Sequence, residues 1–506
     1  MARRMLLGCG LALASAVLAT SSFAPFGAWP LIFVAFVPLL VAQYRVLPAR
    51  WSALAPALGY GGFFAGMFGG VFPPAAAWYM KALPLLVAVG VVVTSLRERS
   101  RRDRSGYRSM PALVATSWVA VELVRLFVPV LGSWGFLGYA LHRQAWLIQP
   151  VRSVGIFGLD LLIMVVNAAI ALLVIAELDR RATFEAPTVV SRRAGLAWCA
   201  LAAGFLGAWI AASLSSLDAP GSTVRVAALQ PGIKRRGLSP EERNRRLLEK
   251  LTEQTREAAA RGAKLVVWPE ATLTVDPTVA HRSELSTLAR ETGATLVLGY
   301  VVFEPHGTRN EAITIEPSGQ FVGLFGKDHP VTFLGGTSLT RGRYPTVETS
   351  FGTIATAICA DLDFTDTVRK LARRGARLIA VPSADWPAIA AKHYTLAVFR
   401  ALESGAAIVK SEFSFDSIIV DASGRILASE ISPEGSAAVL VADVPLRTGA
   451  LPLAARWADW AGWFSLGARV GLALCELLRG RRVKAPALAA VASVAPAQTM
   501  SPRRAS

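Results

Sequence analysis

Eight long apolar runs constrain the fold of this chain more than any other feature of its sequence. A helix needs about 20 consecutive apolar residues to cross a bilayer core, so such runs predict membrane spans. Apolar residues make up 53% of the chain and the mean hydropathy is +0.45, as expected for a multi-span protein. The predicted spans are an N-terminal run to about Ala24, interpreted as a retained signal anchor, and 29–47, 53–79, 82–96, 111–131, 155–176, 195–217 and 452–478.

Basic residues are concentrated in alternate loops between these runs, and cytoplasmic loops carry such an excess. We therefore predict that both termini lie in the cytoplasm and that residues 218–451 lie outside it. The predicted cytoplasmic segments hold Arg45, Arg50, Arg97, Arg99, Arg101, Arg102, Arg104, Arg108, Arg180, Arg181, Arg192, Arg193, Arg479, Arg481, Arg482 and Lys484. The loops predicted on the other side hold chiefly Lys81, Arg143 and Arg152.

The net charge of +18 does not indicate a nucleic-acid partner, because the arginines lie in short loops and no basic helix or stacking motif accompanies them. Four scattered cysteines exclude a disulfide framework, and five histidines without ligand spacing give no reason to expect a metal. Cys9, Cys199 and Cys475 lie in apolar segments, where a cysteine usually packs as a small hydrophobic residue. Only Cys359 lies in the polar part of the chain.

The polar block between the seventh and eighth spans has a different pattern. Short apolar runs typical of strands alternate with charged helical stretches such as Pro240–Arg261, which predicts an α/β domain with one full-sized core. We predict four regions: a transmembrane region at 1–217, a catalytic domain at 218–451, a last membrane helix at 452–478 and a basic, disordered cytoplasmic tail at 479–506.

Three chemically active residues follow or end strand-like runs in this block. Glu270 follows Lys264–Val267, Lys327 follows Gln320–Gly326, and Cys359 closes Gly352–Ile358. A carboxylate, an ammonium group and a thiol suffice for acyl transfer: the carboxylate takes the thiol proton, the sulfur attacks a carbonyl, and the ammonium group holds the oxyanion. We expect the acid and the amine to lower the pKa of the thiol.

These residues carry a resemblance to the carbon–nitrogen hydrolase (nitrilase) superfamily, whose members use a Glu-Lys-Cys set on an αββα sandwich. The block matches at Trp268–Glu270, Gly326–Lys327, Ile358–Asp361, Arg400–Glu403 and Ile418–Gly424. A nitrilase-like block between a seventh and an eighth span resembles the apolipoprotein N-acyltransferase family. A second match to that family lies in the membrane half, at Gly138–Tyr139, Trp146–Pro150, Gly155–Leu159 and Val166–Ala168.

The resemblance implies a bacterial inner-membrane enzyme without a cofactor or metal. It implies that Cys359 takes an acyl chain from a phospholipid as a thioester and passes it to the amino group of a diacylated lipoprotein, with Glu270 as base and Lys327 as oxyanion donor. Asp361, Arg400 and Glu403 would support the site, Asp361 as a hydrogen-bond acceptor and the other two as an ion pair on one helix face. We expect a monomer.

One difference from the family keeps other functions open. The family usually supplies an additional glutamate after the lysine, and Gly335 stands where that acid is expected. A membrane-tethered amidase or nitrilase is one alternative, because the same three residues hydrolyse amides when water is the second nucleophile. A relative that binds lipid and has little or no catalytic activity is the other.

Overall fold

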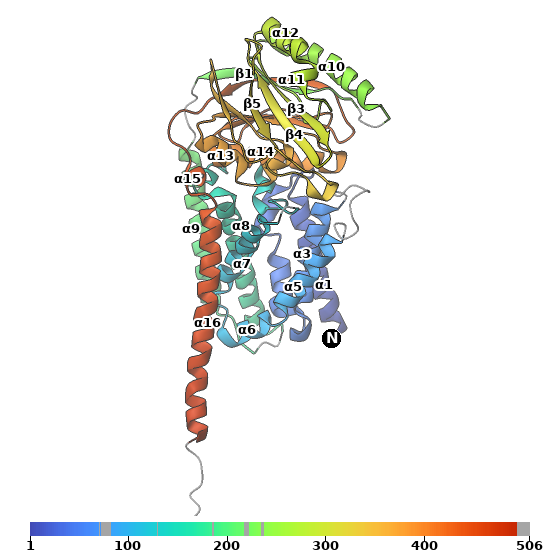
Figure 1. Ribbon diagram of the computed structural model, residues 1–506. Coiled ribbons are helices and arrows are strands. Elements are labelled where there is room, and N and C mark those ends of the chain that lie inside the picture. The colour runs from blue at the N-terminus through green and yellow to red at the C-terminus, as the bar shows by residue number, and fades with distance from the viewer. Residues whose placement is uncertain are drawn as a thin grey trace, which may run out of the picture.

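The computed structural model describes residues 1–69, 71, 82–128, 130–184, 187–216, 222–233 and 237–492. A bundle of helices lies on one side and an α/β domain on the other, and the long helix α16 runs along the bundle away from that domain (Figure 1). Four parts of the prediction lie outside the described residues: the end of the third span, Lys81, the boundary between the transmembrane region and the catalytic domain at 217/218, and residues 493–506.

The bundle contains helices of very different lengths. Within the described residues, four helical segments are long and apolar enough to cross a membrane: Ala2–Ser21, Trp29–Val46, Val151–Arg180 and Arg192–Ser215. The predicted total of eight spans is therefore supported for four of them. The bundle elements are α1 (Ala2–Ser21), η1 (Trp29–Phe33), α2 (Val37–Val41), η2 (Ala42–Val46), η3 (Ala49–Trp51), α3 (Leu54–Phe68), α5 (Leu83–Ser95), α6 (Glu98–Ser105), α7 (Met110–Arg125), η4 (Leu137–Leu141), α8 (Val151–Arg180), α9 (Arg192–Ser215), α15 (Leu453–Trp457) and α16 (Trp460–Ala492).

Two predicted spans differ from single straight helices. The second is a 3-10 turn, a short α-helix and a π-helical turn in succession, and the sixth bends at Gly155, whose φ of +66° lies in the left-handed region that glycine tolerates. The last span was predicted from 452 to 478. It begins instead at Trp460, after a break at Ala458, and continues to Ala492. The tail from residue 479 that was predicted to be disordered stays a prediction.

Loops that were predicted to share one side of the membrane contact one another at the end of the bundle far from the α/β domain. The Arg4 side chain donates to the carbonyl oxygens of Arg45 and Val46, at 3.1 and 2.9 Å, and Arg45 forms an ion pair with Asp179 at 2.7 Å. Arg99 donates to the carbonyl of Leu47. These bonds join the N-terminus and three loops, and Figure 1 places α6 and the N-terminus at that end.

The α/β domain consists of two six-stranded sheets packed face to face. The first has the order β12-β1-β2-β3-β4-β5 and the second the order β11-β10-β9-β8-β7-β6. In the first sheet β1, β2 and β3 run parallel to one another, and in the second sheet β7, β8 and β9 do. The other strands of each sheet pair antiparallel with their neighbours. The strands are β1 (Thr223–Gln230), β2 (Leu265–Val267), β3 (Thr295–Glu304), β4 (Gly307–Ile315), β5 (Phe321–Gly326), β6 (Thr346–Thr349), β7 (Gly352–Thr356), β8 (Leu378–Pro382), β9 (Ala407–Ser411), β10 (Asp416–Val420), β11 (Ile426–Ile431) and β12 (Ala438–Pro445).

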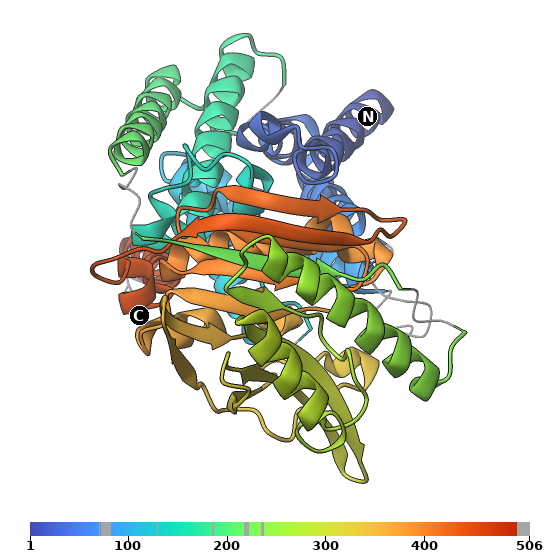
Figure 2. The same ribbon diagram turned by 90° about the horizontal axis from the view of Figure 1, so that it is seen from above.

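Helices cover the outer face of each sheet, which gives the predicted αββα sandwich. On the first sheet α10 (Pro240–Ala260) and α12 (Arg282–Thr292) lie side by side (Figure 2), and the short α11 (Pro277–Ala280) precedes α12. On the second sheet α13 (Thr367–Arg373) and α14 (Pro387–Ser404) lie between the sheet and the bundle (Figure 1). One apolar core continues from the bundle through α14 into the second sheet, so the two halves pack as one body. Among the strands and α-helices of this domain, β6, β11 and α11 are those that no clear apolar or helical period in the sequence indicated.

Candidate active site

Glu270, Lys327 and Cys359 all lie just beyond the end of a strand, as predicted. Glu270 follows β2 and Lys327 follows β5, both in the first sheet, whereas Cys359 follows β7 in the second. The three side chains therefore meet across the sandwich, where the two sheets end together. They line a common cavity of about 820 Å³.

Glu270 and Lys327 form a tight buried pair. Lys327 Nζ lies 2.8 Å from Glu270 Oε1, and the same oxygen accepts a hydrogen bond from Asn310 Nδ2 at 2.7 Å. Burial by itself disfavours the charged lysine, but the neighbouring Cys359 and Glu270 favour it and raise the pKa of Lys327 above its usual value. The lysine therefore stays charged, as an oxyanion donor must.

Cys359 occupies a sparsely populated backbone conformation. Its φ is +46°, and its side chain is 5% exposed. Non-glycine residues with positive φ are uncommon, and such strain is frequently found at active sites. Ala271, directly after Glu270, also has a positive φ of 51°. The chain therefore turns sharply at the thiol and beside the carboxylate, which presents both side chains to the cavity.

The expected lowering of the thiol pKa was wrong. Burial raises the pKa of Cys359 well above its ordinary value, Lys327 opposes this, and the negative charges of Glu270 and Asp385 add to it. The single ammonium group is neutralised by its own carboxylate partner, so it cannot stabilise a thiolate on its own. The resting group is a protonated thiol, and it needs a base for activation.

Of the three predicted supporting residues, Asp361 lies in the turn of Cys359, whereas Arg400 and Glu403 lie on α14. The carboxylate of Asp361 accepts hydrogen bonds from the backbone N–H of Ile358 at 2.8 Å and of His329 at 2.7 Å, so it joins the cysteine turn to the segment after Lys327. Burial raises the pKa of Asp361 to about 7. Its predicted role as a hydrogen-bond acceptor agrees with this geometry.

Arg400 and Glu403 do not line the cavity. They form the expected ion pair, 2.7 Å long, on α14. Arg400 also donates to the hydroxyl of Tyr139 at 2.6 Å, and Glu403 accepts from the backbone N–H of Ile156 at 2.8 Å. Their contacts therefore fasten α14 to the bundle, at η4 and at the bend of α8.

Several charged residues near the thiol were missed by the sequence interpretation. Asp385 Oδ1 lies 3.5 Å from Cys359 Sγ, and the other oxygen of Asp385 lies 2.7 Å from both His393 Nδ1 and Lys410 Nζ. Asp385 follows β8 as Glu270 follows β2, so its position after a strand was an available signal. His393 and Lys410 lie within a helix and a strand, where no local pattern distinguishes them.

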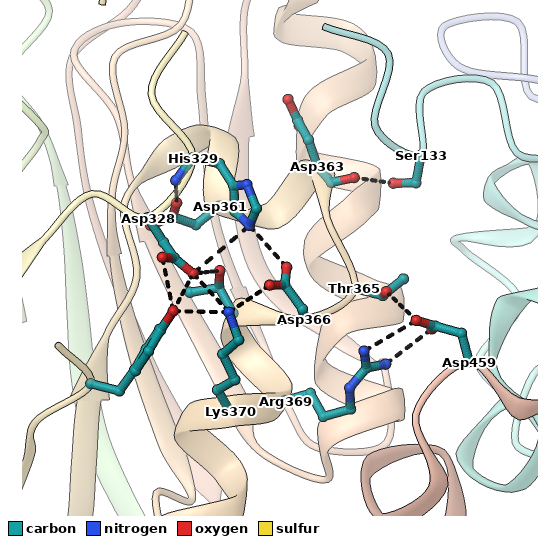
Figure 3. Close-up of polar contacts among 12 residues, drawn as sticks. Ser133, Asp328, His329, Asp361, Asp363, Thr365, Asp366, Arg369, Lys370 and Asp459 are labelled. Atoms are coloured by element: carbon teal, nitrogen blue, oxygen red, sulfur yellow. Dashed lines mark hydrogen bonds and ion pairs between the residues drawn. The ribbon is translucent and has the colours of Figure 1, made fainter. Parts of the chain in front are cut away.

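A second polar network supports the segment after the cysteine (Figure 3). His329 Nε2 lies 2.9 Å from Asp366 Oδ1, and Lys370 Nζ lies 2.6 Å from Asp366 and 3.2 Å from Asp328. Further along, Asp459, just before α16, pairs with Arg369 at 3.0 Å. These contacts hold residues 359–370 against both the α/β core and the bundle.

Among the described residues, two groups of side chains have donor atoms close enough for a metal, but neither fits one well. In the group Cys359, Asp385 and His393, both ring nitrogens of His393 face carboxylates, which raise its pKa to about 10 against the effect of burial. A protonated imidazole has no lone pair for a metal. In the group Asp328, His329 and Asp366, the ammonium group of Lys370 already occupies the space between the carboxylates.

The thiol also borders the membrane half. A small, mainly apolar crevice on its other side is lined by Cys359, by the polar side chains of His329, Asp363 and His393, and by apolar residues of both halves: Phe68, Val71, Val130, Trp134, Phe333, Phe364, Trp386 and Ile389. Pro330 and Val331 line both this crevice and the large cavity. The reactive sulfur thus lies between the cavity that holds Glu270 and Lys327 and a second wall to which residues of the bundle contribute.

Gly335 lies in the wall of the large cavity with a φ of +76°, a left-handed conformation that favours glycine. The segment after Lys327 therefore supplies no carboxylate at this point. The acid whose carboxylate reaches the sulfur in this chain is Asp385.

Two family models match the chain. The model for the apolipoprotein N-acyltransferase N-terminal domain matches residues 15–169, and the carbon–nitrogen hydrolase model matches residues 225–451. The apolipoprotein N-acyltransferase of Geobacter metallireducens is 28% identical over 493 residues, covering 87% of this chain and 89% of its own. That of Gloeobacter violaceus is 28% identical over 505 residues, covering 90% and 91%.

Among solved structures, an amidase from Nesterenkonia sp. is 23% identical and covers 46% of this chain and 94% of its own, with a TM-score of 0.38. The first model matches within the membrane half and the second within the α/β half, and each of the two relatives aligns with nearly nine-tenths or more of the chain. With both domains present along one polypeptide, this chain belongs to the apolipoprotein N-acyltransferase family.

Proposed function

We propose that this chain transfers a fatty acyl chain from a phospholipid to the N-terminal amino group of diacylglyceryl-cysteine in apolipoproteins. The observation that carries the proposal is the position of Cys359, between the cavity of Glu270 and Lys327 and the apolar crevice of the bundle. Both substrates are anchored in lipid, so their reacting groups must reach the enzyme where a membrane surface meets a polar site. The family membership supports the same reaction.

In the first half-reaction the thiol attacks the ester carbonyl of the phospholipid. The S–H bond breaks and its proton passes to the carboxylate of Glu270 while the S–C bond forms. Lys327, held 2.8 Å from Glu270, stabilises the negative charge that develops on the carbonyl oxygen. When the tetrahedral intermediate collapses, the C–O bond breaks and Glu270 returns the proton to the leaving alkoxide. The products are a lysophospholipid and an acyl thioester on Cys359.

In the second half-reaction the amine of the lipoprotein attacks the thioester carbonyl. Glu270 accepts a proton from the nitrogen as the N–C bond forms, and the S–C bond then breaks. The departing sulfur recovers the proton from Glu270, so the enzyme returns to its resting protonation. Because the first product leaves before the second substrate reacts, the kinetics should be ping-pong.

Mass spectrometry of the Cys359 peptide tests this proposal. After the purified protein is incubated with a phospholipid of defined chain length, we expect the peptide to gain the mass of that acyl chain. The adduct should disappear when a diacylglyceryl-cysteine peptide is added, with formation of an N-acylated product. The matched Cys359→Ala protein should form neither. A small acyl group in place of the fatty chain would favour an amidase, and failure of the unaltered protein to form any adduct would contradict the proposal.

We also propose that the α/β domain lies on the extracytoplasmic side of the bacterial inner membrane and that both termini are cytoplasmic. The gathering of the loops of Arg4, Arg45 and Arg99 at the far end of the bundle supports this, because basic loops are retained in the cytoplasm.

Single cysteines at exposed positions test the orientation. With Cys9, Cys199 and Cys475 changed to serine, a membrane-impermeant maleimide applied to spheroplasts should label Glu249→Cys on α10 but not Arg104→Cys on α6. Permeabilised cells should show labelling of both. Labelling of Arg104→Cys alone in intact spheroplasts would reverse the proposed orientation.

A further inference from the structure

Asp385 makes a contact with the reacting sulfur that the reaction scheme above does not use. Its side chain is completely buried, and its Oδ1 atom lies 3.5 Å from Cys359 Sγ and 3.1 Å from Ser383 Oγ. The hydroxyl of Ser383 donates to this oxygen. A distance of 3.5 Å is within the range of a hydrogen bond to sulfur, and a protonated thiol is a donor.

We propose that Asp385 is a second catalytic carboxylate: it accepts a hydrogen bond from the Cys359 thiol in the resting protein, while His393 and Lys410 act as positioning residues that hold it. The proposal adds a residue to the function proposed above and rests on it only for the acyl-transfer step.

Three elements hold Asp385 in this orientation. Oδ2 faces His393 Nδ1 of α14 and Lys410 Nζ of β9, each at 2.7 Å. The backbone N–H of Asp385 donates to Glu412 Oε1 at 2.9 Å. With Oδ2 occupied by two cations, only Oδ1 faces the thiol, and the carboxylate cannot rotate without losing both pairs. Although burial alone would raise the pKa of Asp385, these cations hold it well below its usual value.

His393 is itself held from the bundle side. Its Nε2 lies 3.2 Å from Asp363 Oδ1, and its ring stacks on Trp134 with a centroid distance of 5.8 Å. The carbonyl oxygen of Asp363 accepts hydrogen bonds from both the backbone N–H and the hydroxyl of Ser133, at 2.8 and 2.6 Å; Figure 3 shows the contact between Asp363 and Ser133. The loop before η4 therefore fixes the imidazole that fixes Asp385.

Two further carboxylates, those of Asp416 and Glu412, lie near Lys410 and Asp385. The ammonium group of Lys410 also contacts Asp416 Oδ1 at 2.7 Å. Burial and the nearby charge of Asp385 raise the pKa values of both Asp416 and Glu412. On the opposite side the thiol faces Lys327 and Glu270, whose charges offset each other.

This arrangement gives Asp385 a role different from that of a base. A carboxylate whose pKa is depressed is a poor proton acceptor, but its negative charge disfavours a thiolate next to it. Asp385 therefore keeps the resting sulfur protonated and directs its S–H bond. When the ester carbonyl is bound, the proton passes to Glu270 and the S–C bond forms, while Asp385 remains a carboxylate throughout.

The pH dependence of alkylation of Cys359 tests the proposal without any lipid, so its failure is distinguishable from failure of the proposed function. The full-length protein in detergent, with Cys9, Cys199 and Cys475 changed to serine, is treated with iodoacetamide between pH 6 and 11. Modification of the Cys359 peptide is followed by mass spectrometry, with EDTA present to remove metals. Acyl transfer by each variant is measured in parallel.

Two substitutions should move the alkylation midpoint in opposite directions. Asp385→Asn removes the neighbouring anion, so the midpoint should fall by about one pH unit and alkylation at pH 8 should accelerate about tenfold, whereas acyl transfer should decrease. Ser383→Ala removes a competing donor from Oδ1, so the midpoint should rise by about half a pH unit. Asp443→Asn, which alters an exposed carboxylate paired with Arg225 on another strand, should leave the profile unchanged.

An unchanged or raised midpoint in Asp385→Asn would overturn the proposal, since a raised midpoint would make Asp385 an activator of the thiol. If Asp385→Asn does not fold, as judged by its elution and thermal unfolding, Ser383→Ala decides: a raised midpoint supports the proposal, and an unchanged or lowered one overturns it.

Discussion

Two groups of charged residues meet at Cys359 from opposite sheets, and they differ in how they are built. In the cavity-side group, Glu270 and Lys327 lie just beyond strand ends of the first sheet, and the amide of Asn310 lies within β4; all three line the large cavity. In the buried-side group, Asp385, His393 and Lys410, the carboxylate reaches the cavity wall, while the two cations lie behind it against α14 and β9.

The cavity-side group contains one ion pair whose partners both face the space where a substrate binds. The buried-side group contains several ion pairs with no exposed side chain, and it continues through Asp363 to the bundle. Groups that exchange protons with substrate need access to it, whereas groups that fix geometry are most effective when every polar atom is paired within the protein. The comparison therefore predicts that changes on the first side alter rate, whereas changes to the two cations behind Asp385 on the second side alter stability.

The largest effect is expected on the cavity side. Glu270→Gln keeps the shape of the side chain and can still accept the hydrogen bond of Asn310, but it cannot take a proton. We expect acyl transfer to fall on the order of 10²- to 10⁴-fold, as is typical for loss of a general base. Transfer between a labelled phospholipid and a diacylated peptide measures this, with thermal unfolding as the control. A loss smaller than tenfold would remove Glu270 from the role of base.

A smaller effect, on stability, is expected on the buried side. His393→Gln leaves the two flanking carboxylates without their shared cation, and removal of one partner of a buried pair costs about 3–5 kcal/mol of unfolding free energy. Thermal or denaturant unfolding in detergent measures it. If this variant were as stable as the unaltered protein yet lost its activity, the distinction between the two groups would fail.

His393 also predicts a pH dependence of the stability of the fold. Asp385 and Asp363 raise the pKa of His393 to about 10 in the folded chain, against the effect of burial, whereas an unfolded histidine has a pKa of about 6.5. Its contribution to stability is therefore complete below pH 6.5 and is lost as the pH rises through 10. The difference in unfolding temperature between the unaltered protein and His393→Gln should shrink over that range. A difference independent of pH would show that the imidazole is neutral when buried.

The smallest effect is expected on the cavity side, in the rate of acyl transfer by an Asn310 variant. Asn310→Ala removes one hydrogen bond, 2.7 Å long, to Glu270 Oε1, while Lys327 continues to hold that oxygen. Loss of a hydrogen bond to a charged group predicts a decrease in transfer of about tenfold. Steady-state kinetics would detect it, with the unfolding temperature little changed. A loss as large as that of Glu270→Gln would mean that Asn310 itself contacts the substrate.

Much of the fold could be predicted because its elements carry local signals. The apolar runs predicted the bundle, and the alternation of strands and helices in 218–451 predicted an α/β domain, whose sandwich architecture was implied by the resemblance to the nitrilase superfamily. Short elements were missed: β6 has four residues and α11 has four, too few for a period to show. The last membrane helix was placed too early, because Leu451–Trp457 is apolar although the chain breaks at Ala458.

The candidate site was predicted in part for a similar reason. Glu270, Lys327 and Cys359 each end a strand-like run, and a strand end in an α/β domain directs a side chain toward the site. Lys410 lies within the apolar run of β9, and His393 lies within a helix that is buried on nearly all sides. Neither differs locally from a residue of the core. The pKa of the thiol was mispredicted because the sequence shows neither the burial of Cys359, which is the largest cause of the raised pKa, nor the carboxylate of Asp385 that lies beside it.

By itself the sequence determined what is local along the chain: which segments are apolar enough for a bilayer, which follow the period of a strand or a helix, and which reactive residues close a strand. The tertiary structure alone decided which charges share a site, because pairing depends on distances in space that packing of the two sheets and the bundle sets. Burial then decided the protonation of Cys359, since removal of water penalises a thiolate more than one neutralised ammonium group can offset.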